Sequence, residues 1–151
     1  AAAPLVAAPI VRTRGSFVGS VCHADPQGDW AACMVALDGH IVARGPRGTR
    51  TIKVREFVTG PFQNVLDPDE IAIEAVMPAP TGVAHGGYLK LERRVGDFAT
   101  AAVAVAVDIA GGTVRRPMLE SACRVPFMRL VSALVSWCTT ASAITSPLLA
   151  R

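Results

Sequence analysis

The 151-residue sequence predicts an α+β fold, with a mixed, mainly antiparallel sheet and flanking helices. Three observations predict this class. Residues 29–38 carry one apolar helical pattern among several short β-rich runs. Two of these runs, HIVARG and RTIKV, are joined by the turn residues GPRG, which is typical of a hairpin. The strongest strand pattern, ATAAVAVAVDIA, is followed by a glycine pair and a further strand start.

The first third of the chain contains the expected helices. Residues 1–10 are rich in Ala and Pro, and we expect them to be the frayed end of a helix. Residues 12–26 are punctuated by Gly and Ser without helical periodicity, which predicts an ordered loop. Asp29 is placed to cap the first free N–H groups of the helix that follows, and Gly39 is placed to end it.

The remaining elements are mostly strands. Beyond the hairpin, residues 55–66 predict a brief helical turn and a loop. Strands are expected from the β-rich runs at 70–78, 88–94, 99–110 and from 113 onward. The sequence shows no internal repeat.

Composition excludes some classes of function. The chain is 51% hydrophobic, enough for one modest core in one domain or two small lobes. A net charge of +3, without a basic run that interleaves with aromatics, argues against nucleic-acid binding. The four cysteines and three histidines lack zinc-ligand spacing, so we expect no metal site and thiols in a reducing compartment.

Neither end of the chain predicts targeting to a membrane. In residues 1–14 the charges follow the apolar stretch, whereas a secretory signal has them before it. We therefore expect a truncated start and a cytoplasmic protein. Residues 130–150 are uncharged and long enough to span a bilayer, but they contain four Ser, three Thr and Pro147, so we expect no membrane span.

One loop has the residue types of a ligand site. In Gly15–Ser20, glycines allow close approach of a ligand, and Ser hydroxyls or loop N–H groups can donate to phosphate or a polar cofactor edge. Asp29 could alternatively accept from ligand hydroxyls, such as those of a ribityl chain. The same pattern also occurs in ordinary turns. No nucleophile elbow, P-loop or dinucleotide fingerprint is present, and His23 and Lys90 fit exposed surface residues on spacing alone.

Five blocks in order carry a family resemblance. They are RTRGSFVGSVCHADPQGDW, MVALDGHIVARGPRGTRTI, EFVTGPF, LDPDEIAIEAVMP and GYLKLERRVGDFA. With compatible spacing across residues 4–116, the chain resembles the FAD-binding medium subunit of molybdenum hydroxylases, the family of carbon monoxide and xanthine dehydrogenases.

The resemblance implies a domain division. Residues 1–80 correspond to part of the FAD-binding domain of PCMH type, its second lobe. Residues 81–116 correspond to the start of the carbon monoxide dehydrogenase flavoprotein C-terminal domain. Residues 117–151 do not follow the family, and we interpret them as a divergent tail, translated out of frame as a hypothesis.

The resemblance also implies cofactor-binding positions in the first block. Ser16 matches a Thr/Ser position, and Gly19 matches the second Gly of a Gly pair. Ser20 matches a position that contributes a side chain to FAD, and Asp29 matches the carboxylate that binds it.

Later blocks supply the other implied cofactor positions. Ile71 and Ala72 match apolar positions against the flavin ring. Tyr88 matches an aromatic that lies near the ring in some members, and Lys90 matches the lysine of the Y-x-K motif.

The implied chemistry is electron relay through FAD, with no catalytic side chain in this chain. The implied partners are a large molybdopterin-binding subunit and a small subunit with [2Fe-2S] clusters. One departure is Val18, which replaces the first Gly of the pair and is expected to penalise φ > 0 and weaken FAD binding. A second is the absence of the family's N-terminal A-G-G-T loop. The alternative function is a truncated assembly fragment or pseudogene product without FAD.

Overall fold

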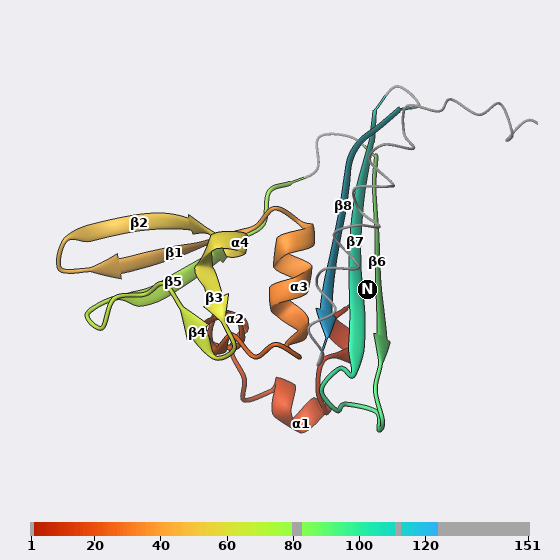
Figure 1. Cartoon of the computed structure of the whole chain (residues 1–151), viewed down its shortest axis with the longest axis horizontal. Helices are drawn as coiled ribbons and strands as arrows, with labels where there is room; N and C mark the ends of the chain where they lie inside the picture. The colour runs from red at the N-terminus through yellow and green to blue at the C-terminus, as the bar shows by residue number, and fades with distance from the viewer. Residues whose placement is uncertain (1, 80–82, 111–112, 124–151) are drawn as a thin grey trace, which may run out of the picture.

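The computed structural model describes residues 2–79, 83–110 and 113–123 (Figure 1). Its helices precede or interrupt the first strands: η1 Ala3–Leu5, α1 Pro9–Arg12, α2 Phe17–His23, α3 Asp29–Ala36 and α4 Val54–Phe57. Its strands are β1 His40–Gly45, β2 Gly48–Lys53, β3 Val58–Gly60, β4 Gln63–Asn64, β5 Ile71–Val76, β6 Val83–Leu91, β7 Ala101–Ala110 and β8 Thr113–Cys123.

Every strand pairing in the described residues is antiparallel, which confirms the predicted α+β class. The strands form three sheets with the orders β2-β1-β5, β3-β4 and β6-β7-β8. The predicted hairpin is β1–β2, with Gly45 opposite Gly48 at its turn. Helix α3 stands between the β2-β1-β5 sheet and the β6-β7-β8 sheet (Figure 1).

The prediction of a loop over residues 12–26 is wrong, because α2 lies there. The Ser16 hydroxyl accepts a hydrogen bond from the Gly19 N–H at 3.2 Å and so caps the helix, and Ala24 ends it with a left-handed φ of 53°. Only Val21 of this short helix is buried. A helix with one buried side chain leaves no apolar periodicity in the sequence.

Helix α3 is present where predicted, but both of its ends differ from the prediction. Its N-cap is Gly28, and the Asp29 side chain makes no capping bond. The left-handed residue after the helix is Asp38, with φ 52°, rather than Gly39. Gly39 instead packs closely on Met34, since a Cβ there would lie 2.7 Å from the Cε and 3.1 Å from the carbonyl oxygen of Met34.

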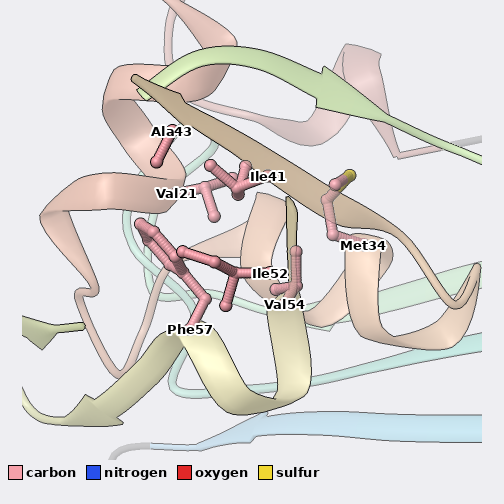
Figure 2. Close-up of a cluster of buried hydrophobic side chains, with 7 residues drawn as sticks. All are labelled: Val21, Met34, Ile41, Ala43, Ile52, Val54 and Phe57. Carbon is pink, nitrogen blue, oxygen red and sulfur yellow. The ribbon is translucent and has the colours of Figure 1, made fainter. Parts of the chain in front are cut away.

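Two apolar clusters pack on the two sides of α3. The first contains large side chains from α2, α3, α4 and the hairpin (Figure 2): Val21, Met34, Ile41, Ala43, Ile52, Val54 and Phe57. The second is mostly alanine, joins α3 to β6 and β7, and contains Ala32, Ala36, Tyr88, Ala99, Ala102 and Ala104.

The ends of the chain differ in how far the structure describes them. The expected N-terminal helix is replaced by η1 and the four-residue α1. The predicted boundary at residue 80 falls between β5 and β6. Residues 117–123 of the predicted tail lie in β8, and the apolar stretch 130–150 lies outside the described residues. Among the helices that are described, none has the length and apolar character required to cross a bilayer.

Candidate cofactor-binding site

A cavity of about 540 Å³ lies where the N-terminal segment, the starts of α2 and α3, and the turn before β7 meet. This volume is within the range of small-molecule sites, roughly 300 to 1,000 Å³. These four segments supply the lining residues: Ala3, Val6, Ala7, Val11, Arg12, Gly15, Ser16, Phe17, Ser20, Gly28, Asp29, Trp30, Gly96, Asp97 and Phe98.

The turn before β7 and the N-terminal segment are held together closely. Gly96 has φ +87°, and a Cβ there would lie 2.9 Å from the backbone N of Ala8. Arg12 holds the N-terminal segment in a turn. Its Nη1 donates to the carbonyl oxygen of Val6 at 2.8 Å and to that of Ala7. Gly96 and Arg12 therefore give this side of the cavity a defined wall.

The cavity has an aromatic wall. The rings of Phe17 and Trp30 lie with centroids 4.6 Å apart at an interplanar angle of 51°. Phe98 lines the cavity from the turn before β7. Aromatic faces of this kind pack well against a flat ring and exclude water from it.

The polar centre of the site is Asp29, a carboxylate that is only 6% exposed. The Tyr88 hydroxyl donates to its Oδ1, and the Lys90 ammonium donates to its Oδ2 at 3.1 Å. Lys90 also donates to the Leu5 carbonyl at 3.0 Å and lies 3.3 Å from Glu92 Oε2. These contacts join β6 and the N-terminal segment to the start of α3.

Burial of this cluster raises the pKa values of two groups, Tyr88 and Cys33. Burial, followed by the hydrogen bond to Asp29, raises the pKa of Tyr88 above its usual value. Burial and the negative charge of Asp29 raise the pKa of Cys33 to about 11. Both groups are therefore protonated at neutral pH, and Cys33 lacks the thiolate character of a nucleophile.

The structure brings three of the eight predicted site residues together at the cavity: Ser16, Ser20 and Asp29. Gly19 lies behind them, where a Cβ would come within 2.6 Å of Ser16 Oγ. This glycine thus permits the Ser16 cap. The role of Ser16 as a helix cap was not anticipated from the sequence.

The other four predicted residues lie outside the cavity lining. Ile71 and Ala72 are on β5, and Ile71 is exposed. Tyr88 and Lys90 reach the site through Asp29. The alternative that Lys90 is an exposed lysine is wrong, because its side chain is 1% exposed.

Sequence reasoning missed several residues of the site. Arg12, Trp30 and Phe98 line the cavity although each belongs to a quoted block. Phe98 follows a Gly-Asp pair, and only the folded chain shows that this turn meets α2. Across the described residues, no group of three His, Cys, Asp or Glu side chains is arranged to hold a metal ion.

The expected strain at Val18 does not occur. Val18 lies inside α2, and the non-glycine residues with positive φ in the described part of the chain are Ala7, Ala24, Asp38 and Phe62. It is also outside the cavity lining. A residue in a right-handed helix has negative φ, so the predicted backbone strain at Val18 is wrong.

Comparison with known proteins identifies the class of this fold and site. The model of the family described as "FAD binding domain in molybdopterin dehydrogenase" matches residues 1–80, more than half of the chain. The chain belongs to this family. FAD is therefore the cofactor that this family binds, and most of the cavity-lining residues lie in the matched part of the chain.

Individual relatives agree with this assignment. The carbon monoxide dehydrogenase medium chain of Hydrogenophaga pseudoflava is 38% identical over 113 residues, which cover 75% of this chain and 39% of that protein. The nicotine 6-hydroxylase medium subunit of Paenarthrobacter nicotinovorans is 36% identical over 110 residues, 72% of this chain and 38% of that one. These relatives are subunits of oxidoreductases.

A solved structure shares the fold. Carbon monoxide dehydrogenase from Hydrogenophaga pseudoflava superposes with a TM-score of 0.76 at 37% identity, covering 80% of this chain and 42% of that one. The present chain thus spans about two fifths of the length of the relatives that it matches.

The residues of the cavity fit a part of FAD. Each Asp29 oxygen has two lone pairs, and in the described residues each receives one hydrogen bond, so each can accept one more from a ligand hydroxyl. Ser16 and Ser20 add polar side chains, and Phe17, Trp30 and Phe98 add an aromatic wall.

Proposed function

We propose that this chain is an FAD-binding, electron-transferring part of a molybdenum-containing hydroxylase or dehydrogenase. The observation that carries the proposal is the placement of the Asp29 carboxylate in the wall of a cavity that Ser16 and Ser20 also line. All three residues lie in the part of the chain that matches the FAD-binding family.

The polar and aromatic side chains of the cavity have different roles in binding the cofactor. Asp29, which is buried, accepts hydrogen bonds from hydroxyls of the cofactor, and hydrogen bonds to a carboxylate are stronger than those between neutral groups. Ser16 and Ser20 contribute polar contacts at the start of α2, while Phe17 and Trp30 exclude water. When bound, FAD supplies the redox chemistry, and the protein holds and orients it.

The proposed partners are a large molybdopterin-binding subunit and a small iron–sulfur subunit. The names "medium chain" and "medium subunit" of the relatives support an assembly with larger and smaller subunits. In this proposal FAD, when bound, would supply the electron relay between iron–sulfur clusters of a partner and an acceptor in the cytoplasm, and this chain would hold the flavin. The substrate is selected by the large subunit.

Uptake of FAD by the purified chain tests the proposal. We expect dialysis against FAD to leave about one flavin per chain, visible as the absorbance of oxidised flavin. Ser20→Leu, which places bulk in the cavity, should weaken uptake about tenfold or more, equivalent to about 1.4 kcal/mol or more. Thr51→Leu on the exposed face of β2 is the matched control and should have no effect.

Two results would contradict the proposal. A chain that is folded but colourless after dialysis would favour the non-catalytic assembly fragment. Equal uptake by the Ser20→Leu and Thr51→Leu chains would place the flavin elsewhere than in this cavity.

A further inference from the structure

We propose that Tyr88, Lys90 and Glu92 form a positioning set that holds the Asp29 carboxylate in the cavity wall, with one acceptor site on each oxygen directed to ligand hydroxyls. This inference rests on the proposed function and adds residues that act through Asp29. Of these four residues, Asp29 alone lines the cavity. Tyr88 and Lys90 act on a ligand in the cavity through their hydrogen bonds to Asp29.

The alternation of β6 places the set. Successive side chains of a strand point to opposite faces, so Tyr88 and Lys90 share the face that packs on α3. Leu89 and Leu91, on the opposite face, are 78% and 65% exposed. The polar residues thus lie toward the helix and the apolar ones toward solvent, the reverse of the order that burial alone favours.

Protein acceptors enclose the Lys90 ammonium. It donates to Asp29 Oδ2 at 3.1 Å and to the Leu5 carbonyl at 3.0 Å, and Glu92 Oε2 lies 3.3 Å away as an ion-pair partner without a hydrogen bond. A lysine that is almost completely buried requires such pairing, because an isolated buried charge is very costly. Its function is consequently to fix the position of the Asp29 carboxylate.

Glu92 and Tyr88 complete the set from opposite sides. Glu92 Oε2 is buried without a hydrogen-bond partner in the described residues, and its ion pair with Lys90 at 3.3 Å adds a second carboxylate beside the ammonium. The Tyr88 hydroxyl donates its one proton to Asp29 Oδ1. With Tyr88 on one oxygen and Lys90 on the other, rotation of the Asp29 carboxylate is restrained at both ends.

A double-mutant cycle on the 151-residue chain tests the proposal. The variants are Tyr88→Phe, Asp29→Ala and both together, and the probes are FAD and lumiflavin, a flavin ring without the hydroxyl-bearing chain. Tyr88→Phe keeps the ring and removes one hydrogen bond, so we expect FAD binding to weaken about fivefold. In the Asp29→Ala background, where the acceptor of the Tyr88 hydroxyl is gone, the same change should cause no further loss. Thermal unfolding of each variant verifies that it is folded at the temperature of the assay.

Comparing FAD with lumiflavin distinguishes an effect of Tyr88 on the position of Asp29 from an effect of Tyr88 on the stability of the fold. If Tyr88 positions Asp29, its removal leaves lumiflavin binding unchanged, because that ligand offers no hydroxyl chain. Equal losses for both ligands, or equal losses with and without Asp29→Ala, would overturn the positioning set while leaving FAD binding in place. A wild-type chain that takes up no FAD would overturn the proposed function as well.

Discussion

The two sides of α3 are built in different ways. On one side, Met34 packs into a cluster of large side chains that includes Phe57 and Ile41 (Figure 2). On the other side, Ala32 and Ala36 meet the alanines of β7, with the Asp29–Tyr88–Lys90 contacts at the end of the interface. The first interface buries much apolar area, and the second brings the backbones close and fixes a carboxylate.

The two sides of α3 differ in what they contribute, one to stability and the other to the geometry of the site. Apolar burial is non-directional and proportional to area, so the Phe57 side contributes most to stability. Alanines contribute less area, and a hydrogen-bonded ionic cluster sets geometry more than stability. The side of α3 that holds the cavity thus depends on directed contacts, and mutations on the two sides should have different consequences.

The largest expected effect is on the side with large side chains. Phe57→Ala removes a fully buried ring, and we expect the free energy of unfolding to fall by about 3–5 kcal/mol in a denaturant titration. Val95→Ala, at a 98% exposed position, is the control and should change it by less than about 0.5 kcal/mol. Similar costs for both would mean that the cluster is not the main source of stability.

The next largest effect is expected from the buried lysine. Lys90→Met leaves two carboxylates without their cation, and we expect the free energy of unfolding to fall by about 3 kcal/mol. Lys53→Met removes an exposed pair with Asp38 and should cost less than about 1 kcal/mol. Chemical denaturation of both variants gives the comparison, and a Lys90→Met chain as stable as Lys53→Met would contradict the buried position of Lys90.

Enlarging an alanine tests the close approach of α3 to β7. Ala104→Leu overpacks a position that is 3% exposed, and we expect a loss of about 2 kcal/mol together with weaker FAD uptake, because the helix carrying Asp29 is displaced. Leu91→Ala on the outer face should alter neither quantity. If Ala104→Leu lowered stability and left FAD uptake intact, the alanine interface would not position the site.

A pH titration probes Tyr88. Its folded-state pKa is raised by burial and by Asp29, so its contribution to stability is present below the ordinary value of 10.0 and is lost as pH rises above that value. Tyr88 is the only tyrosine of the chain, so near-ultraviolet absorbance reports its ionisation directly. We expect tyrosinate to form only with alkaline unfolding, and ionisation near pH 10 in a folded chain would show that the hydroxyl is not held by Asp29.

The smallest expected effect concerns the ion pair between Arg50 of the hairpin, whose side chain is 45% exposed, and Glu70, whose side chain is 8% exposed. Hydrogen bonds from Arg50 and then from the backbone of Asp67 lower the pKa of Glu70 to about 2 from 4.5. Its contribution is therefore present above pH 4.5 and is lost as pH falls toward about 2. Glu70→Gln should reduce the slope of unfolding free energy against pH in this window, and an unchanged slope would mean that the pair with Arg50 does not persist.

Patterns that are local in sequence predicted much of the fold. The turn residues between β1 and β2 and the alternating run of β7 each specify structure within a few residues. Helix α2 was not predictable in this way, because with Val21 as its one buried residue it has no apolar stripe. The ends of α3 were predicted wrongly since Asp29 is used in a tertiary contact rather than as a cap.

The site was only partly predictable for a related reason. The family resemblance named Asp29, Tyr88 and Lys90 separately, as positions next to a cofactor. Asp29 and Tyr88 are 59 residues apart, and no local pattern indicates that they touch. Their contact depends on how β6 packs against α3, which is a property of the folded chain.

The dissociation constant of FAD for the wild-type and Asp29→Asn chains tests the account most directly. We expect the wild-type chain to bind about one FAD, and the variant to bind it about tenfold or more weakly, because a hydrogen bond to a charged group contributes about 1.5–3 kcal/mol. Equal affinities for the two chains would contradict the central role of Asp29 in the cavity.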